Sequence, residues 1–143
     1  MKQEYLLFLV SIFLSVTTFS QNPAPIPTFR IDGLIISKAR YDSLKLERSS
    51  ILKIRSMAPT QAASVYGQKA SQGVGIITTS KMFLVVSASG ASKSVVTSEE
   101  KEAMLSALEE SQIRTMRNID AATLKVEFKL DHADGAIVLQ LKE

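Results

Sequence analysis

The chain has 143 residues, 45% of them hydrophobic and 22% charged, which is the composition of an ordinary globular protein. Its formal net charge of +3 is spread along the sequence without a basic run or an aromatic platform, which argues against nucleic-acid binding. No cysteine is present, and this excludes a disulfide framework and a lipoprotein anchor.

Residues 1–20 have the three parts of a secretory signal peptide. Lys2 supplies the positive end, an apolar run extends from Leu6 to Val16, and small residues precede a cleavage site expected between Ser20 and Gln21. The run is about a dozen residues long, whereas a helix that spans a bilayer needs roughly 20. We therefore predict an exported, periplasmic protein with no transmembrane span after cleavage, and the outer membrane is one location open to it. An uncleaved membrane anchor is the alternative.

A proline-rich leader is predicted over residues 21–28, which include three prolines and favour extended backbone. The remaining residues, 29–143, suit one domain. A chain of this size can bury about two-thirds of its unfolded surface, so it needs no metal or cross-link to fold.

The first half of this domain predicts alternating strands and helices. Asp32 and Gly33 suit a tight turn. Pro59 suits the first turn of a short helix, and Gly67 suits its C-terminal end. The predicted elements are a bent strand over residues 29–37, a helix over 38–49, a strand over 51–57, a helix over 58–66 and a strand over 74–79.

The second half contains a capping box at Thr97–Glu100, which predicts that a helix begins there. Apolar and charged residues alternate over 124–130, a pattern typical of a half-buried strand. The predicted elements are a buried strand over 82–89, a loop over 90–97, a helix over 99–110, strands over 113–119 and 124–130, a turn over 132–135 and a strand over 136–142. The predicted fold class is α+β, with a small mixed β-sheet of roughly six strands and two or three helices.

An internal repeat is one interpretation of a gapless shift that aligns residues 46–81 with 108–142. The shift matches identical residues at several positions. These pairs are Leu46 and Leu108, Ile51 and Ile113, Arg55 and Arg117, and Gly73 and Gly135. The agreement fails where residues 58–66 predict a helix and 124–130 predict a strand. Two degenerate copies of one helix–strand unit and a chance similarity both stay open.

Five short motifs follow one another between residues 26 and 81: an Ile-Asp-Gly turn, an Ile-x-x-Ile strand, an Ala-rich helix ending in Tyr-Gly, a Gly-Val strand start and a Thr-Thr strand end. Their residues are Ile31, Asp32, Gly33, Ile51, Ile54, Ala62, Ala63, Tyr66, Gly67, Gly73, Val74, Ile77, Thr78 and Thr79, with Lys81 following after Ser80. In this order, the segment resembles part of the plug domain of TonB-dependent outer-membrane receptors. The motif residues themselves suggest folding roles rather than chemical ones.

The resemblance implies a plug-like fold and a partner such as an outer-membrane receptor barrel or a TonB-like protein. The sequence departs from the plug pattern at Ser50, where an acidic residue is usual, at Met57-Ala58, where glycine or aspartate is frequent, and at Ala70, where glycine is usual. A receptor also needs many barrel strands after its plug, and the sequence given ends at Glu143. We therefore expect no complete transporter.

Residues with catalytic or metal-binding chemistry are few. His132 is the only histidine and lies between Asp131 and Asp134, where a solvated turn is favoured over a metal site. Ser50 and Lys53 match Ser-x-x-Lys, but residues three apart on a strand point to opposite faces. A set of acidic residues is predicted to form the solvated face of a helix and comprises Glu99, Glu100, Glu102, Glu109 and Glu110. No enzyme, metal or cofactor is predicted.

The leading functional hypothesis is an exported, non-enzymatic module that acts by protein–protein contact in the cell envelope. An exposed sheet edge is a ready site for strand addition. One alternative is a freestanding module that binds a small ligand or glycan, for which Tyr41, Tyr66 and a few phenylalanines are the aromatic candidates. Another is a truncated receptor fragment.

Overall fold

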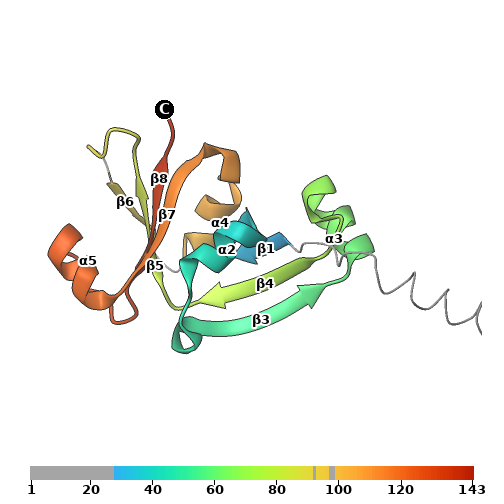
Figure 1. Cartoon of the computed structure of the whole chain (residues 1–143), viewed down its shortest axis with the longest axis horizontal. Helices are drawn as coiled ribbons and strands as arrows, with labels where there is room; N and C mark the ends of the chain where they lie inside the picture. The colour runs from blue at the N-terminus through green and yellow to red at the C-terminus, as the bar shows by residue number, and fades with distance from the viewer. Residues whose placement is uncertain (1–27, 92, 97–98) are drawn as a thin grey trace, which may run out of the picture.

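The computed structural model describes residues 28–91, 93–96 and 99–143 (Figure 1). The signal peptide and nearly all of the proline-rich leader, expected at 1–20 and 21–28, lie outside these residues. Among the helices in the described ranges, none has both the length and the apolar character that crossing a bilayer requires.

The first half of the domain forms a four-stranded mixed sheet with the strand order β2-β1-β4-β3. The central strands β1 and β4 are parallel, and each outer strand is antiparallel to its neighbour. The elements in chain order are β1 (Thr28–Ile31), β2 (Leu34–Ser37), α2 (Lys38–Leu44), a 3₁₀ turn (Arg48–Ser50), β3 (Ile51–Met57), α3 (Pro59–Tyr66), a 3₁₀ turn (Gln68–Ala70) and β4 (Val74–Thr79).

The second half forms another four-stranded mixed sheet, with the order β6-β5-β8-β7 and the same pattern of parallel and antiparallel pairs. Its elements are β5 (Met82–Val86), β6 (Lys93–Val96), α4 (Lys101–Ser106), a 3₁₀ turn (Glu110–Gln112), β7 (Ile113–Ile119), α5 (Ala121–Phe128) and β8 (Ala136–Leu141). We call residues 28–79 the first unit and residues 82–141 the second unit.

The two units share more than their strand order. The shift that aligns Ile51 with Ile113 also superposes the bounds of β3 on β7, α3 on α5 and β4 on β8. Both long outer strands carry a bulge at the same place, between Ile51 and Lys53 and between Ile113 and Thr115. The prediction of two similar units within an α+β fold is therefore confirmed, although the strands form two sheets rather than one.

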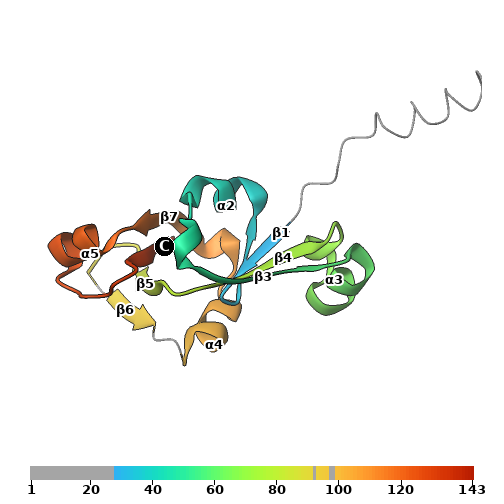
Figure 2. The ribbon, with the colours of Figure 1, turned by 90° about the horizontal axis from the view of Figure 1, so that it is seen from below.

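The core of the domain consists of three hydrophobic clusters. The largest lies between them and combines buried residues of the first unit, such as Ile31 and Ile77, with buried residues of the second, such as Phe83 and Leu139. The other two clusters lie under α3 on the first sheet and under α5 on the second. In Figure 2, α3 and α5 accordingly lie at opposite ends of the molecule, with α2 and α4 between them.

The strand predicted over 124–130 is wrong, because most of this segment forms α5. Asp120 caps the helix by accepting a hydrogen bond from the Thr123 backbone N–H at 2.7 Å. Leu124 and Phe128, four residues apart, then lie on one helical face and pack on the same cluster, whereas Val126 is exposed. Over such a short stretch, an apolar residue at every second position fits both the two-residue period of a strand and the 3.6-residue period of a helix.

The loop predicted over 90–97 is wrong in part, because residues 93–96 form β6 and pair with β5. The helix predicted over 38–49 ends at Leu44, since Lys45 takes a left-handed conformation. Of the helix predicted over 99–110, only α4, Lys101–Ser106, is α-helical. Thr97 and Ser98 of the expected capping box lie outside the described residues, and the Glu100 side chain makes no capping hydrogen bond.

Candidate interaction surface

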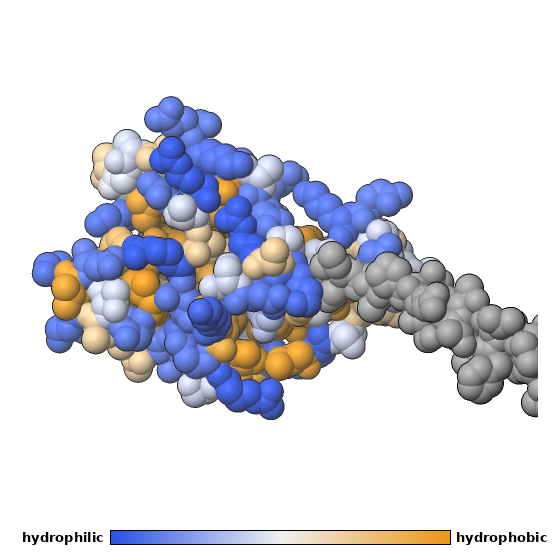
Figure 3. Space-filling model, in the orientation of Figure 1, coloured by the Kyte–Doolittle hydropathy of each residue, from blue (hydrophilic) through white to orange (hydrophobic). Residues whose placement is uncertain are grey.

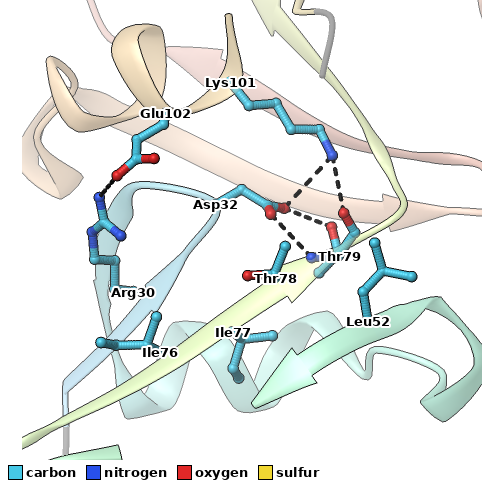
Figure 4. A pocket seen from close by; sticks show the side chains of 9 residues that line it. All are labelled: Arg30, Asp32, Leu52, Ile76, Ile77, Thr78, Thr79, Lys101 and Glu102. Carbon is cyan, nitrogen blue, oxygen red and sulfur yellow. Dashed lines mark hydrogen bonds and ion pairs between the residues drawn. The ribbon is translucent and has the colours of Figure 1, made fainter. Parts of the chain in front are cut away.

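The turn between β1 and β2 is fastened to the end of β4 by two motif residues (Figure 4). Asp32 accepts hydrogen bonds from the Thr79 backbone N–H at 3.0 Å and from the Thr79 hydroxyl at 2.6 Å. Lys101 of the second unit donates to the Thr79 carbonyl at 3.1 Å and lies 3.8 Å from the Asp32 carboxylate. Burial lowers the pKa of Lys101, and the Asp32 charge opposes that shift. This cluster gives Asp32 and Thr79 a folding role.

The other plug-like motif residues also lie mainly in packing or turn positions. Ile31, Val74 and Ile77 are buried, Ile51 is half-buried, and Tyr66 stacks under the Arg30 guanidinium at 5.7 Å. Gly33, Gly67 and Gly73 have positive φ angles, and Thr78 lies on β4 opposite Lys53. Ile54 and Thr78 are the exceptions, because both are exposed, Ile54 at 54%. A core role does not explain them.

Lys81, between the two units, is almost completely buried, with only 1% of its side chain exposed. Its ammonium donates to the Asp134 carbonyl at 2.7 Å and lies 3.2 Å from a carboxylate oxygen of Glu47. It thereby joins a loop of the first unit to the turn before β8. Lys81 is a link between the units rather than a free amine.

Replacing Glu47 with glutamine should reduce the loss of unfolding free energy that accompanies a fall to acidic pH. Its pKa is lowered from 4.5, first by a backbone hydrogen bond at Glu47 and then by Lys81 and Asn118, although burial opposes the shift. A lowered carboxylate pKa contributes stability above the unfolded value, and this contribution is lost as the pH falls through the folded value.

Urea unfolding at pH 7 and at several pH values below 4.5 measures this effect. The stability difference between the wild type and Glu47→Gln should shrink as the pH falls. Glu143→Gln, at an exposed position, is the control and should change the profile little. A difference that stays constant across the range would contradict the assigned role of Glu47.

The residues considered for catalysis are dispersed. The Ser50 hydroxyl donates to the Glu47 carbonyl at 2.8 Å, while Lys53 projects from β3 into solvent. Asp131 lies 3.5 Å from Lys125, and the carbonyl of His132 accepts from Gly135 within the predicted turn. Across the described ranges, no three His, Asp or Glu side chains gather as a metal site would require.

Three of the five acidic residues predicted on one helical face instead bridge the two units. Glu102 pairs with Arg30 at 2.7 Å, Glu109 with Lys69 at 3.4 Å and Glu110 with Arg40 at 3.2 Å. Only Glu102 lies within α4, whereas Glu99 and Glu100 precede that helix. The prediction of a solvated helical face is therefore wrong for Glu109 and Glu110.

Three of the four outer strands are short or are contacted by the other unit. The backbone N–H of Ser37, at the end of the four-residue β2, donates to Glu110 at 3.1 Å. Helix α2 packs beside β7, where Arg40 donates to the Ile113 carbonyl at 3.3 Å. Strand β6 has only four residues. The seven-residue β3 is the long outer strand that remains.

We call the outer side of β3, residues 51–57, the β3 edge. Its five central residues, 52–56, are all exposed, including Leu52 at 67% and Ile54 at 54%. Lys53 and Arg55 have no ion-pair or hydrogen-bond partner for their side chains within the described part of the chain. Figure 3 shows hydrophobic side chains gathered along the lower margin of the molecule, where Figure 1 places β3, with hydrophilic side chains around them.

Two open grooves adjoin this edge at Leu52, and Thr79 and Lys101 line both of them. One, of about 260 Å³, is also lined by Arg30 and Asp32. The other, of about 340 Å³, is also lined by Val95 and His132. The β3 edge therefore continues into hollows that both units line.

Neither a protein-family model nor a curated protein nor a solved structure significantly matches this chain. The site is therefore defined by its own geometry. Sequence reasoning missed Leu52, Lys53 and Arg55 as surface residues. The signal that could have indicated them is the apolar–basic alternation from Leu52 to Arg55.

Proposed function

We propose that this protein is an exported, non-enzymatic module, similar in design to a receptor plug domain, that acts by protein–protein contact in the cell envelope. The observation that carries the proposal is the open β3 edge, because unpaired strand backbone and exposed apolar side chains together favour strand addition by a partner. The signal peptide predicted at residues 1–20 supports the cell envelope as the location.

The resemblance over residues 26–81 supports the plug-like part of this proposal. The motif pair Asp32 and Thr79 is hydrogen-bonded, so these motif residues serve one folded substructure. An outer-membrane receptor barrel or a TonB-like protein is the partner that the resemblance implies.

A glycan-binding module has less support, because free aromatic platforms are the usual sign of such a site. Tyr41 stacks on Phe29 with ring centroids 4.1 Å apart, and Tyr66 is occupied by Arg30. Both tyrosines in the described ranges therefore pack within the domain.

Cross-linking in the cell envelope tests the proposal. The full chain, tagged after Glu143, is cross-linked in intact cells of its host, and the captured proteins are identified against an exported, tagged control protein. Repeated recovery of an outer-membrane barrel or a TonB-like protein above the control is the expected result. Recovery of abundant envelope proteins only, from folded and abundant protein, would refute the contact function.

A further inference from the structure

The outer strands β3 and β7 occupy equivalent positions in the two units but differ in what covers them. The shift that relates the units places β3 on β7. Strand β7 is partly covered, because Arg40 reaches the Ile113 carbonyl and Asn118 donates to Glu47. No side-chain hydrogen bond or ion pair between described residues reaches β3 in the same way. One unit thus uses this edge for internal packing, and the other leaves it free.

The basic side chains of the β3 edge lie on one face of the sheet, and Ile54 lies on the other. In the pairing of β3 with β4, Lys53 lies opposite Thr78 and Arg55 lies opposite Ile76. These positions belong to the face of the first sheet that packs against α3. Ile54 pairs with Ile77, on the side of the shared core, because successive strand residues point to opposite faces. A strand added here would therefore meet cations on one face and an apolar extension of the core on the other.

These cations disfavour a second copy of the chain as the occupant. In an antiparallel pair of β3 strands centred on Ile54, Lys53 of each copy would lie opposite Arg55 of the other. A pair centred on Lys53 or on Arg55 would place that residue opposite itself. Like charges directly opposite each other destabilise a strand pair.

The same cations favour a complementary partner. Edge lysines often serve only to prevent aggregation, but such edges do not usually leave large apolar residues exposed beside the charges. Here Leu52 and Ile54 are more than half exposed within the same strand. An acidic residue opposite Lys53 or Arg55 would gain an attractive cross-strand pair, and an apolar residue beside Ile54 would bury surface.

We propose that the β3 edge binds, by strand addition, an extended segment of another protein in which acidic residues alternate with apolar residues. This inference rests on the proposed contact function and specifies its site and its partner. Backbone hydrogen bonds to β3 supply the affinity, while Lys53 and Arg55 select the acidic face of the incoming strand.

The test measures binding of the full chain to an acetylated, amidated peptide of four Glu-Val repeats. Amide hydrogen exchange of the chain, with and without the peptide, then locates the binding site. We expect slower exchange at β3 amides and weaker binding at higher salt. A peptide of four Lys-Val repeats should not bind. A Glu-Val peptide methylated at alternate backbone nitrogens keeps its charges but loses strand donors, and it should also fail to bind.

Charge reversal provides the matched variants. Lys53→Glu together with Arg55→Glu should weaken binding of the Glu-Val peptide by about 10-fold or more and should create binding of the Lys-Val peptide, which the wild type lacks. Arg114→Glu, at an exposed position of β7, is the control and should leave both affinities unchanged.

Three outcomes would overturn the inference: no slowed exchange at β3, equal binding of the methylated peptide, or an equal loss in the Arg114 variant. The envelope cross-linking experiment separates this failure from that of the proposed function. If Lys53→Glu/Arg55→Glu protein still captures the same partner, contact function stands and the assignment to β3 falls. If the wild type captures none, the contact function itself fails.

Discussion

Replacing Gly135 with alanine is expected to destabilise the fold by about 3 kcal/mol, because the added carbon has no room. Gly135 precedes β8 with a φ of +73°, and a Cβ placed on it would lie 2.1 Å from the Ile119 carbonyl oxygen and 2.9 Å from the Asp120 backbone. These are main-chain atoms at the junction of β7 and α5, so they cannot yield as a flexible side chain would.

Gly90→Ala is the matched control for this substitution. Gly90 has a similar φ of +76°, but a Cβ there would meet nothing within 4 Å. It should therefore cost only the conformational penalty of a left-handed alanine, about 1–2 kcal/mol. Urea unfolding of both variants measures the difference. Equal losses of stability would show that the close approach at Gly135 relaxes freely.

Replacing Asp32 with alanine is the second substitution with a large expected effect, a loss of about 4 kcal/mol. Its carboxylate accepts both hydrogen bonds from Thr79 and faces Lys101, and the Asp32 and Lys101 side chains are only 3% and 12% exposed. Removal leaves a largely buried ammonium without its counter-charge. Alanine also tolerates the φ of +50° at this position poorly.

Asp32→Asn separates these contributions, because asparagine tolerates the left-handed conformation and retains an oxygen that can accept from Thr79. We expect a smaller loss, about 2 kcal/mol, from the missing charge. Combining it with Lys101→Met should recover part of that loss in a double-mutant cycle. If Asp32→Asn and Asp32→Ala cost the same and Lys101→Met has no coupling to either, the pair contributes little to stability.

Elements with strong local signals could be predicted from the sequence. Strand β3 and helix α3 agree closely with their predicted ranges, because Pro59 and Gly67 mark a helix start and end whatever surrounds them. Residues 124–130 were misread, since their alternation is too short to distinguish a strand from a helix with Leu124 and Phe128 on its buried face.

The candidate surface could not be predicted in the same way, because exposure depends on what the fold places beside each strand. Strands β3 and β7 have related sequences, yet only β7 is contacted in this way, by the side chains of Arg40 and Glu47 from the first unit. Glu110 similarly gains its partner Arg40 from a distant part of the chain. Such pairings arise from the packing of one unit on the other, which the order of residue types in a single strand does not encode.

The hydrophobic cluster between the sheets has a consequence for how this domain unfolds. Ile31, Leu34 and Ile77 are covered by Phe83, Ile137 and Leu139, so separating the halves would expose both sets to water. The two units have the same architecture, but neither is expected to fold without the other. The chain from β1 to β8 should melt in a single cooperative transition, and a fragment that stops at Ser80 should remain without a stable native state.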